Sequence, residues 1–258
     1  MDLDQGWLCK DRGSSVIATA IHAGHELRPE VKDVIAIDDA TRAREEDPHT
    51  DRFTSGIPSR IVVGRSRFEV DLNRPRSKAV YREPGDAFGL EVWKQPWTDG
   101  MIARSLETYD RFYRTLEGML QTRIAAGRAF VVLDIHSYNH RRAGPDAPPE
   151  DIAGNPDLNV GTGTLDRHRW GSLVRDFIDN FRSAAGGLDV RENVRFQGGS
   201  MAKWIHSRYG KHGCCFALEF KKTFMDEWTG ELDRDRLAEL VSALTSTVPQ
   251  LEDRAAAA

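Results

Sequence analysis

The amino-acid sequence predicts an α/β fold, with a mostly parallel or mixed sheet that helices cover on both faces. Short apolar runs typical of buried strands alternate with segments of helical periodicity from one end of the chain to the other. The length of 258 residues, of which 40% are hydrophobic, is enough to bury a sizeable core. We therefore expect residues 1–258 to form a single domain.

The first element is a short β-branched run at 14–21, which is predicted to be a buried strand that ends directly at His22. Gly24 then allows the backbone to turn. Residues 30–46 have helical character, and Pro48 ends that helix. Ligands of α/β sheets bind beyond the carboxyl ends of the strands, so His22 lies at a position suited to a functional site.

The remaining elements follow the same two patterns. Four further segments are predicted strands, the first two joined as a hairpin at Gly64: 59–63, 67–72, 130–135 and 214–220. Four segments are predicted helices: 99–127, 166–183, 201–209 and 231–247. Residues 141–159 are rich in proline, glycine and aspartate, and we expect an active-site loop there. Residues 252–258, which end in four alanines, are expected to be a disordered tail.

Charge and cysteine content exclude several classes of function. The net charge of −4, with lysines and arginines scattered among acids, provides no basic stripe for a nucleic acid. No apolar run approaches the roughly 20 residues that span a bilayer, and the first residues do not resemble a signal peptide. Three cysteines, two of them adjacent, suit a reducing compartment. We expect a cytoplasmic protein that acts on a small molecule; its oligomeric state stays open.

Histidines at predicted strand ends indicate a metal site. A catalytic zinc needs about three His, Asp or Glu ligands and one position for water. His22 and His25 lie three residues apart in a glycine-containing turn, and His136 follows another predicted strand, so these three are predicted ligands. Asp51 has three open roles: a ligand, a hydrogen-bond acceptor that orients a ligand histidine, or a helix cap or surface partner of Arg52.

Glu219 is the predicted catalytic residue. It lies between Leu218 and Phe220 on an otherwise apolar strand, where a carboxylate is costly to bury unless it is paired or functional. Apolar surroundings raise the pKa of a carboxyl group, which suits a general base. The alternative is a structural ion pair with Lys221 or Lys222.

Substrate-binding residues are predicted where strands end. Asn73 and Arg74 form an amide–guanidinium pair that suits recognition of a substrate carboxylate. Tyr138, two residues after His136, either lines the pocket or caps its strand. Arg141, with Arg142 beside it at the start of the long loop, either meets a second acidic group or is a solvated charge.

Read together, these motifs resemble the N-formylglutamate amidohydrolase family, which is similar in fold to zinc carboxypeptidases and aspartoacylase. The resemblance extends from about Val16 to Trp228 and rests on short ordered blocks: Ile21-His22-Ala23-Gly24, Thr50-Asp51-Arg52, Ser66-Arg67-Phe68, Asp71-Leu72-Asn73-Arg74-Pro75, Asp134-Ile135-His136-Ser137, Asn159-Val160-Gly161-Thr162, Arg195-Phe196-Gln197-Gly198-Gly199 and Leu218-Glu219.

The resemblance implies a three-layer αβα domain with a mixed, mostly parallel sheet and one zinc ion. It gives His22 and His136 the ligand-histidine positions, Glu219 the general-base position, and Asn73 with Arg74 the carboxylate anchor. The implied reaction is hydrolysis of N-formyl-L-glutamate to formate and glutamate. Alternatives are a carboxypeptidase, another N-acyl amino acid deacylase, or a non-catalytic amino-acid-binding module.

The chain departs from its relatives at two points. Zinc carboxypeptidases carry Glu three residues after the first ligand, where this chain has His25, and typical formylglutamate hydrolases have neither residue there. Asp51 is therefore a rival second ligand. Ser200 follows Gly198-Gly199 where many formylglutamate hydrolases carry a histidine. The departures leave the reaction class in place and the exact substrate open.

Overall fold

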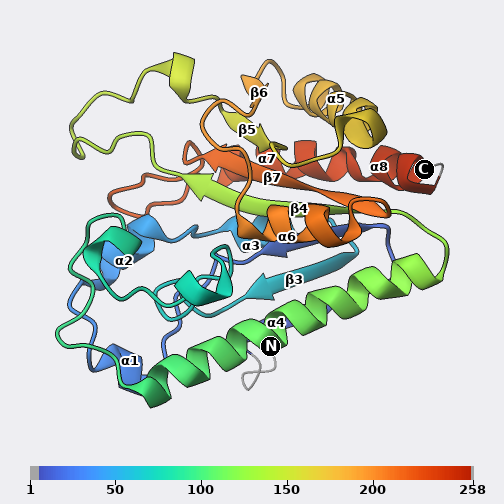
Figure 1. Cartoon of the computed structure of the whole chain (residues 1–258). Coiled ribbons are helices and arrows are strands. Elements are labelled where there is room, and N and C mark those ends of the chain that lie inside the picture. Colours follow the sequence, from blue (N-terminus) through green and yellow to red (C-terminus); the bar gives the residue numbers. More distant parts are fainter. Residues whose placement is uncertain (1–5, 257–258) are drawn as a thin grey trace.

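A seven-stranded sheet forms the centre of the molecule (Figure 1). The computed structural model describes residues 6–256. The strand order is β1-β3-β2-β4-β7-β5-β6. The strands are β1 Trp7–Lys10, β2 Val16–Ala20, β3 Ser59–Val63, β4 Phe130–Tyr138, β5 Leu158–Gly161, β6 Val190–Glu192 and β7 Gly213–Lys221. Strands β3, β2, β4 and β7 run parallel, while β1 and β5 pair antiparallel with β3 and β7. The prediction of a mixed, mostly parallel sheet is confirmed.

The two longest strands lie at the middle of the sheet. Every residue of β4 is buried, and β7 pairs with β4 in register from Phe130–Gly213 to Tyr138–Lys221. Strands buried on both faces read as continuous apolar runs, which explains why the sequence identified these two. Because both strands are parallel, their carboxyl ends meet at one edge of the sheet.

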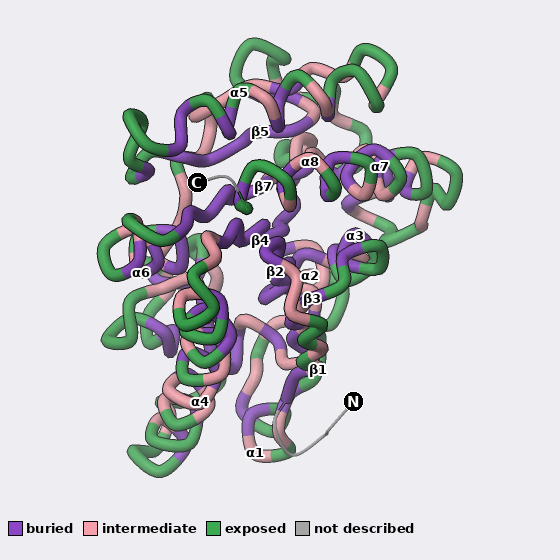
Figure 2. The backbone as a smooth tube through the Cα atoms, turned by 90° about the vertical axis from the view of Figure 1, so that its right-hand side faces the viewer, coloured by how far each residue is buried: buried purple, intermediate pink, exposed green. Residues whose placement is uncertain are grey.

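Helices cover both faces of the sheet and complete three layers. Their bounds are α1 Pro29–Lys32, α2 Asp39–Glu45, α3 Thr50–Phe53, α4 Asp99–Ala125, α5 Arg167–Ala184, α6 Ser200–Tyr209, α7 Arg234–Ser246 and α8 Val248–Ala256. Apolar residues of α3, α5, α7 and α8 pack on one face of the sheet, and those of α4 and α6 pack on the other. Figure 2 shows this division, with the buried sheet between α4 and α6 on one side and α3, α7 and α8 on the other.

Three predictions about elements were wrong. The segment 67–72 is a turn-rich loop, so it forms no hairpin with β3, which pairs instead with β1 and β2. The predicted helix at 30–46 is interrupted and forms α1 and α2. The predicted disordered tail is helical up to Ala256, because Leu251 and Ala255 are buried in the core; residues 257–258 lie outside the described part.

Other elements match the prediction closely. The helices predicted at 99–127, 166–183 and 201–209 are α4, α5 and α6. The long connection from β4 to β5 contains only one short turn of helix, at Ile152–Gly154. Within residues 6–256, no helix is both long and apolar enough to cross a membrane.

Candidate metal centre and active site

Two histidines and one aspartate meet at the carboxyl edge of the sheet. One ligand-type atom from each of His22, Asp47 and His136 lies within 4.8 Å of the others, and all three residues are buried. The Oδ2 atom of Asp47 lies 3.0 Å from Nδ1 of His136 and 3.4 Å from Nδ1 of His22. His22 follows β2, and His136 lies near the end of the adjacent strand β4. Parallel pairing therefore places both imidazoles at the same end of the sheet.

Asp47 reaches this position through its own backbone. The Asp47 N–H donates to the carbonyl oxygen of His22 at 2.9 Å, which fixes the residue beside the first histidine. Lys222 holds the preceding segment: its buried ammonium donates to the carbonyl oxygens of Arg44 (2.7 Å) and Glu46 (2.9 Å). Burial lowers the pKa of Lys222 to about 8, against the raising effect of the Asp47 charge.

The Nε2 atoms of both histidines lie close to carboxylates other than Asp47. His22 Nε2 lies 2.8 Å from Asp71 Oδ1, and His136 Nε2 lies 3.0 Å from Asp134 Oδ2. His22 Nδ1 is buried with no hydrogen-bond partner. Metal-binding histidines commonly donate one ring N–H to a carboxylate and offer the other nitrogen to the ion. The two imidazoles and Asp47 therefore fit a metal that binds nitrogen and oxygen ligands.

Neighbouring charges shift the pKa values of the groups in and around this cluster towards their charged forms. Burial raises the pKa of Asp47, but the hydrogen bond with His136 and the nearby His22 imidazole outweigh burial and hold that pKa below its usual range. Burial lowers the pKa of His136, and the negative charge of Asp134 reverses the shift, so the pKa lies well above its usual value. In Asp71, burial is likewise outweighed, here by the Arg67 guanidinium, and the pKa lies well below its usual range.

Glu219 lies directly beside the cluster. It occupies the position on β7 that pairs with His136 on β4, so the two side chains extend from the same face of the sheet. Burial raises the pKa of Glu219 to about 7, although the positive charge of His136 opposes the shift. A carboxyl group with this pKa can accept and return a proton near neutral pH. Neither Lys221 nor Lys222 pairs with it: Lys221 binds Asp157, and Lys222 binds the carbonyls named above.

Asn73 is fixed against the second histidine. Its Nδ2 lies 3.3 Å from His136 Nε2, and its Oδ1 accepts the Met201 N–H at the start of α6. A Cβ added at Gly199 would lie 2.3 Å from Asn73 Oδ1, so only glycine allows this approach. Gly199, the residue before Ser200, thus allows the chain to pack against Asn73.

Two predicted ligands lie outside the cluster. The His25 ring is 44% exposed, with Nδ1 2.5 Å from Glu46 Oε2 and Nε2 2.5 Å from the Arg42 guanidinium. Asp51 is an exposed residue in the first turn of α3, and its backbone carbonyl accepts the Thr54 hydroxyl. The structure brings Asp47 to the position for which these two residues were predicted.

Of the four predicted substrate-binding residues, two line the cavity beside the cluster and two do not. Asn73 and Tyr138 line the cavity beside the cluster, although the Tyr138 hydroxyl donates to the Pro156 carbonyl. Arg74 does not line it: its guanidinium donates to the Asp86 carbonyl at 3.1 Å. Arg141 pairs with Asp226 and lies in a different hollow.

Three other arginines, Arg44, Arg67 and Arg142, line the cavity in their place. Arg67 donates to Asp71 at 2.9 Å, and Arg142 lies at the mouth with a 40% exposed side chain. Arg67 stands in a block of the sequence that carried the family resemblance, but nothing in its residue pattern singled it out as a cavity residue. Arg142 was named beside Arg141, and only the path of the loop distinguishes them.

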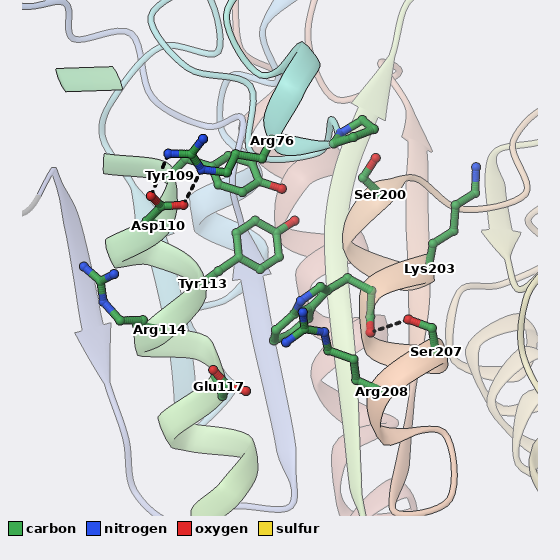
Figure 3. A pocket seen from close by; sticks show the side chains of 12 residues that line it. Arg76, Tyr109, Asp110, Tyr113, Arg114, Glu117, Ser200, Lys203, Ser207 and Arg208 are labelled. Atoms are coloured by element: carbon green, nitrogen blue, oxygen red, sulfur yellow. Dashed lines mark hydrogen bonds and ion pairs between the residues drawn. The ribbon is translucent and has the colours of Figure 1, made fainter. Parts of the chain in front are cut away.

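The cavity is small and polar. It has a volume of about 140 Å³ and contains all three cluster residues and Glu219 in its lining. A larger hollow of about 680 Å³ lies between α4 and α6, lined in part by Tyr109, Tyr113 and Lys203 (Figure 3). It contains none of the cluster residues, so its size does not make it the reaction site.

Comparisons with known proteins agree with this fold. An N-formylglutamate amidohydrolase from Ralstonia eutropha JMP134 aligns with a TM-score of 0.74 and 17% identity, over 97% of this chain and 98% of that one. A gene product of Agrobacterium tumefaciens aligns with a TM-score of 0.63 and 15% identity, over 99% and 97%. A metallo-carboxypeptidase from Burkholderia cenocepacia aligns at 0.42 and 14%, over 93% and 57%. A search of curated proteins finds no match in sequence.

The fold therefore places the chain in a class of three-layer αβα proteins that includes an amidohydrolase. The family model for N-formylglutamate amidohydrolase matches residues 14–225, which include every cluster residue and Glu219. The chain belongs to the N-formylglutamate amidohydrolase family and is an amide-bond hydrolase.

Proposed function

We propose that this protein is a zinc-dependent hydrolase of the amide bond of an N-acyl amino acid, with N-formyl-L-glutamate as the foremost substrate. The observation that carries the proposal is the buried group of His22, Asp47 and His136 beside Glu219. Two imidazoles and a carboxylate suit zinc, which leaves a fourth position open in its catalytic sites. Zinc held there would polarise the amide carbonyl and lower the pKa of a water molecule.

Glu219 then acts as the general base and general acid. Its carboxylate takes a proton from the attacking water and delivers it to the nitrogen that leaves with the amino acid. Its pKa of about 7 lets the side chain accept a proton and give it up again at neutral pH. Asn73 and the cavity-lining Arg67 are placed to orient the substrate through directed hydrogen bonds.

The Glu219→Gln variant tests the catalytic role. Gln has the same shape but cannot take a proton, so we expect zinc content near wild type and a loss of at least about 100-fold in formate release. Formate release from N-formyl-L-glutamate and metal content by mass spectrometry are measured on the same preparation. More than a tenth of wild-type turnover, or less than about a tenth of an equivalent of zinc in the wild type, would contradict the proposal.

The substrate is tested by a panel of amides. N-formyl-L-glutamate is expected to have the highest kcat/KM among formyl, acetyl and dipeptide derivatives of the same amino acid. Preferred release of acetate would make the protein a different N-acyl amino acid deacylase, and preferred release of a C-terminal residue would make it a carboxypeptidase. Binding without any turnover would favour an amino-acid-binding module.

A cytoplasmic location is part of the proposal, supported by three free thiols.

A further inference from the structure

Two guanidinium groups stand at the mouth of the cavity. Arg44 and Arg142 both line it, and both face Glu45, at 3.7 Å and 3.8 Å. These distances are longer than those of an ordinary hydrogen bond, so the single carboxylate leaves donors of both arginines unused. Arg44 Nε is buried without a hydrogen-bond partner. A planar donor group with free N–H atoms is suited to a ligand carboxylate.

The charge at the mouth also favours an anion. Glu45 is buried and faces both arginines, so this part of the cavity carries one negative and two positive side chains. The nearby Glu46 is engaged by Ser66 and by the ring of His25. A second carboxylate would therefore complete the pairing of the two guanidiniums without leaving an excess of negative charge.

Trp228 fixes both arginines. The Arg44 guanidinium lies 3.7 Å from the centroid of the Trp228 ring, a stacking geometry that orients the planar group. The indole N–H of Trp228 donates to the Arg141 carbonyl at 3.0 Å, which fixes the peptide that leads into Arg142. The buried Glu227 adds two contacts, because its carboxylate accepts the backbone N–H groups of His140 and Arg141.

We propose that Arg44 and Arg142, positioned by Trp228, bind a second anionic group of the substrate, a side-chain carboxylate, while the amide lies at the His22–Asp47–His136 group. This inference rests on the proposed function in that it places an amino-acid product in the cavity. It assigns selection for an acidic side chain to the mouth, where neither Arg74 nor Arg141 lies.

The test compares two ligands that differ only in side-chain charge. L-glutamate and L-glutamine are titrated into zinc-loaded protein and their Kd values are measured by calorimetry. We expect the wild type to bind glutamate at least about tenfold more tightly, and the Arg142→Gln variant to reduce this ratio to below about threefold. Arg141→Gln, which removes the same charge one residue earlier, is the matched control and should keep the wild-type ratio.

Trp228 is tested by the same ratio. Trp228→Leu, which removes the stack and the hydrogen bond, should reduce the glutamate preference as far as Arg142→Gln does. Trp228→Phe keeps an aromatic face for Arg44 and should restore part of the preference, whereas a purely structural role would change both Kd values together. Equal wild-type affinity for the two ligands, or a ratio that falls in Arg141→Gln instead, would overturn the proposal. Because binding is measured without turnover, this result is independent of whether formate is released.

Discussion

Asp47 belongs to the candidate metal site, but its sequence context did not indicate this. It follows Glu45 and Glu46 in an acidic run, which reads as the solvated end of a helix. Its role depends on two contacts with residues distant in the chain, the His22 carbonyl and the His136 ring. In contrast, His22, His136 and Glu219 were predictable, because each polar side chain lies at or near the end of an apolar run. The apolar pattern of a strand indicates where such a residue lies. A carboxylate in a loop, such as that of Asp47, has no comparable pattern around it.

Replacing Asp47 should weaken metal binding specifically. Asp47→Asn removes the anionic oxygen from the group, so zinc affinity should fall by more than about 100-fold, since residues outside the ligand shell alone contribute roughly 10- to 100-fold. Asp51→Asn is the matched control, with the same chemical change four residues later on an exposed helical turn, and should leave affinity unchanged. Competition with a chromophoric chelator measures both. An equal loss of zinc affinity in the two variants would indicate that Asp51 is also a metal ligand.

At the scale of the elements, the sequence predicted what long periodic segments determine. Helices α4, α5 and α6 and strands β2, β4 and β7 have enough residues for their periodicity to be visible. Strands β1, β5 and β6 have three or four residues each, too few to show alternation, and their pairing depends on neighbours already in the sheet. The false hairpin at Gly64 has a different cause, since its glycine serves a close contact between two loops.

That contact predicts the effect of an alanine at Gly24. A Cβ there would lie 2.1 Å from the Gly64 carbonyl carbon, and backbone atoms cannot move aside as a side-chain tip can. Gly24→Ala should therefore reduce the free energy of unfolding by about 3 kcal/mol or more. Gly118→Ala, on an exposed position of α4 with open space around it, should increase it by about 0.5–1 kcal/mol. Urea denaturation measures both, and a neutral Gly24→Ala would show that the two loops separate readily.

At the scale of the whole molecule, the ionisation of Glu219 reduces the stability of the metal-free protein. The pKa of Glu219 is about 7 in the folded chain, against an ordinary value of 4.5. A carboxyl group whose folded pKa is raised opposes folding once it ionises, so the protein loses stability as pH rises from about 4.5 through 7. Summed over that window, the loss is on the order of 3 kcal/mol.

The Glu219→Gln variant should remove this loss. After chelation of metal, the variant is expected to be more stable than the wild type, and by a wider margin at pH 8 than at pH 5. Denaturant midpoints at the two pH values measure the difference, with the exposed Glu91→Gln as the control. A margin that narrows towards pH 8 would show that Glu219 is stabilised as an anion by its neighbours.

The spatial order of the strands differs from their order in the chain. β7 lies between β4 and β5, yet it follows β5 and β6 in the chain. A growing polypeptide that has passed β6 but not reached residue 213 has no partner for that edge of β4, and β5 has only β6 beside it. An open edge of a buried strand is a template for association with other chains. β7 fills this edge and also carries Glu219 to its place beside His136, so one strand both completes the sheet and positions the candidate general base.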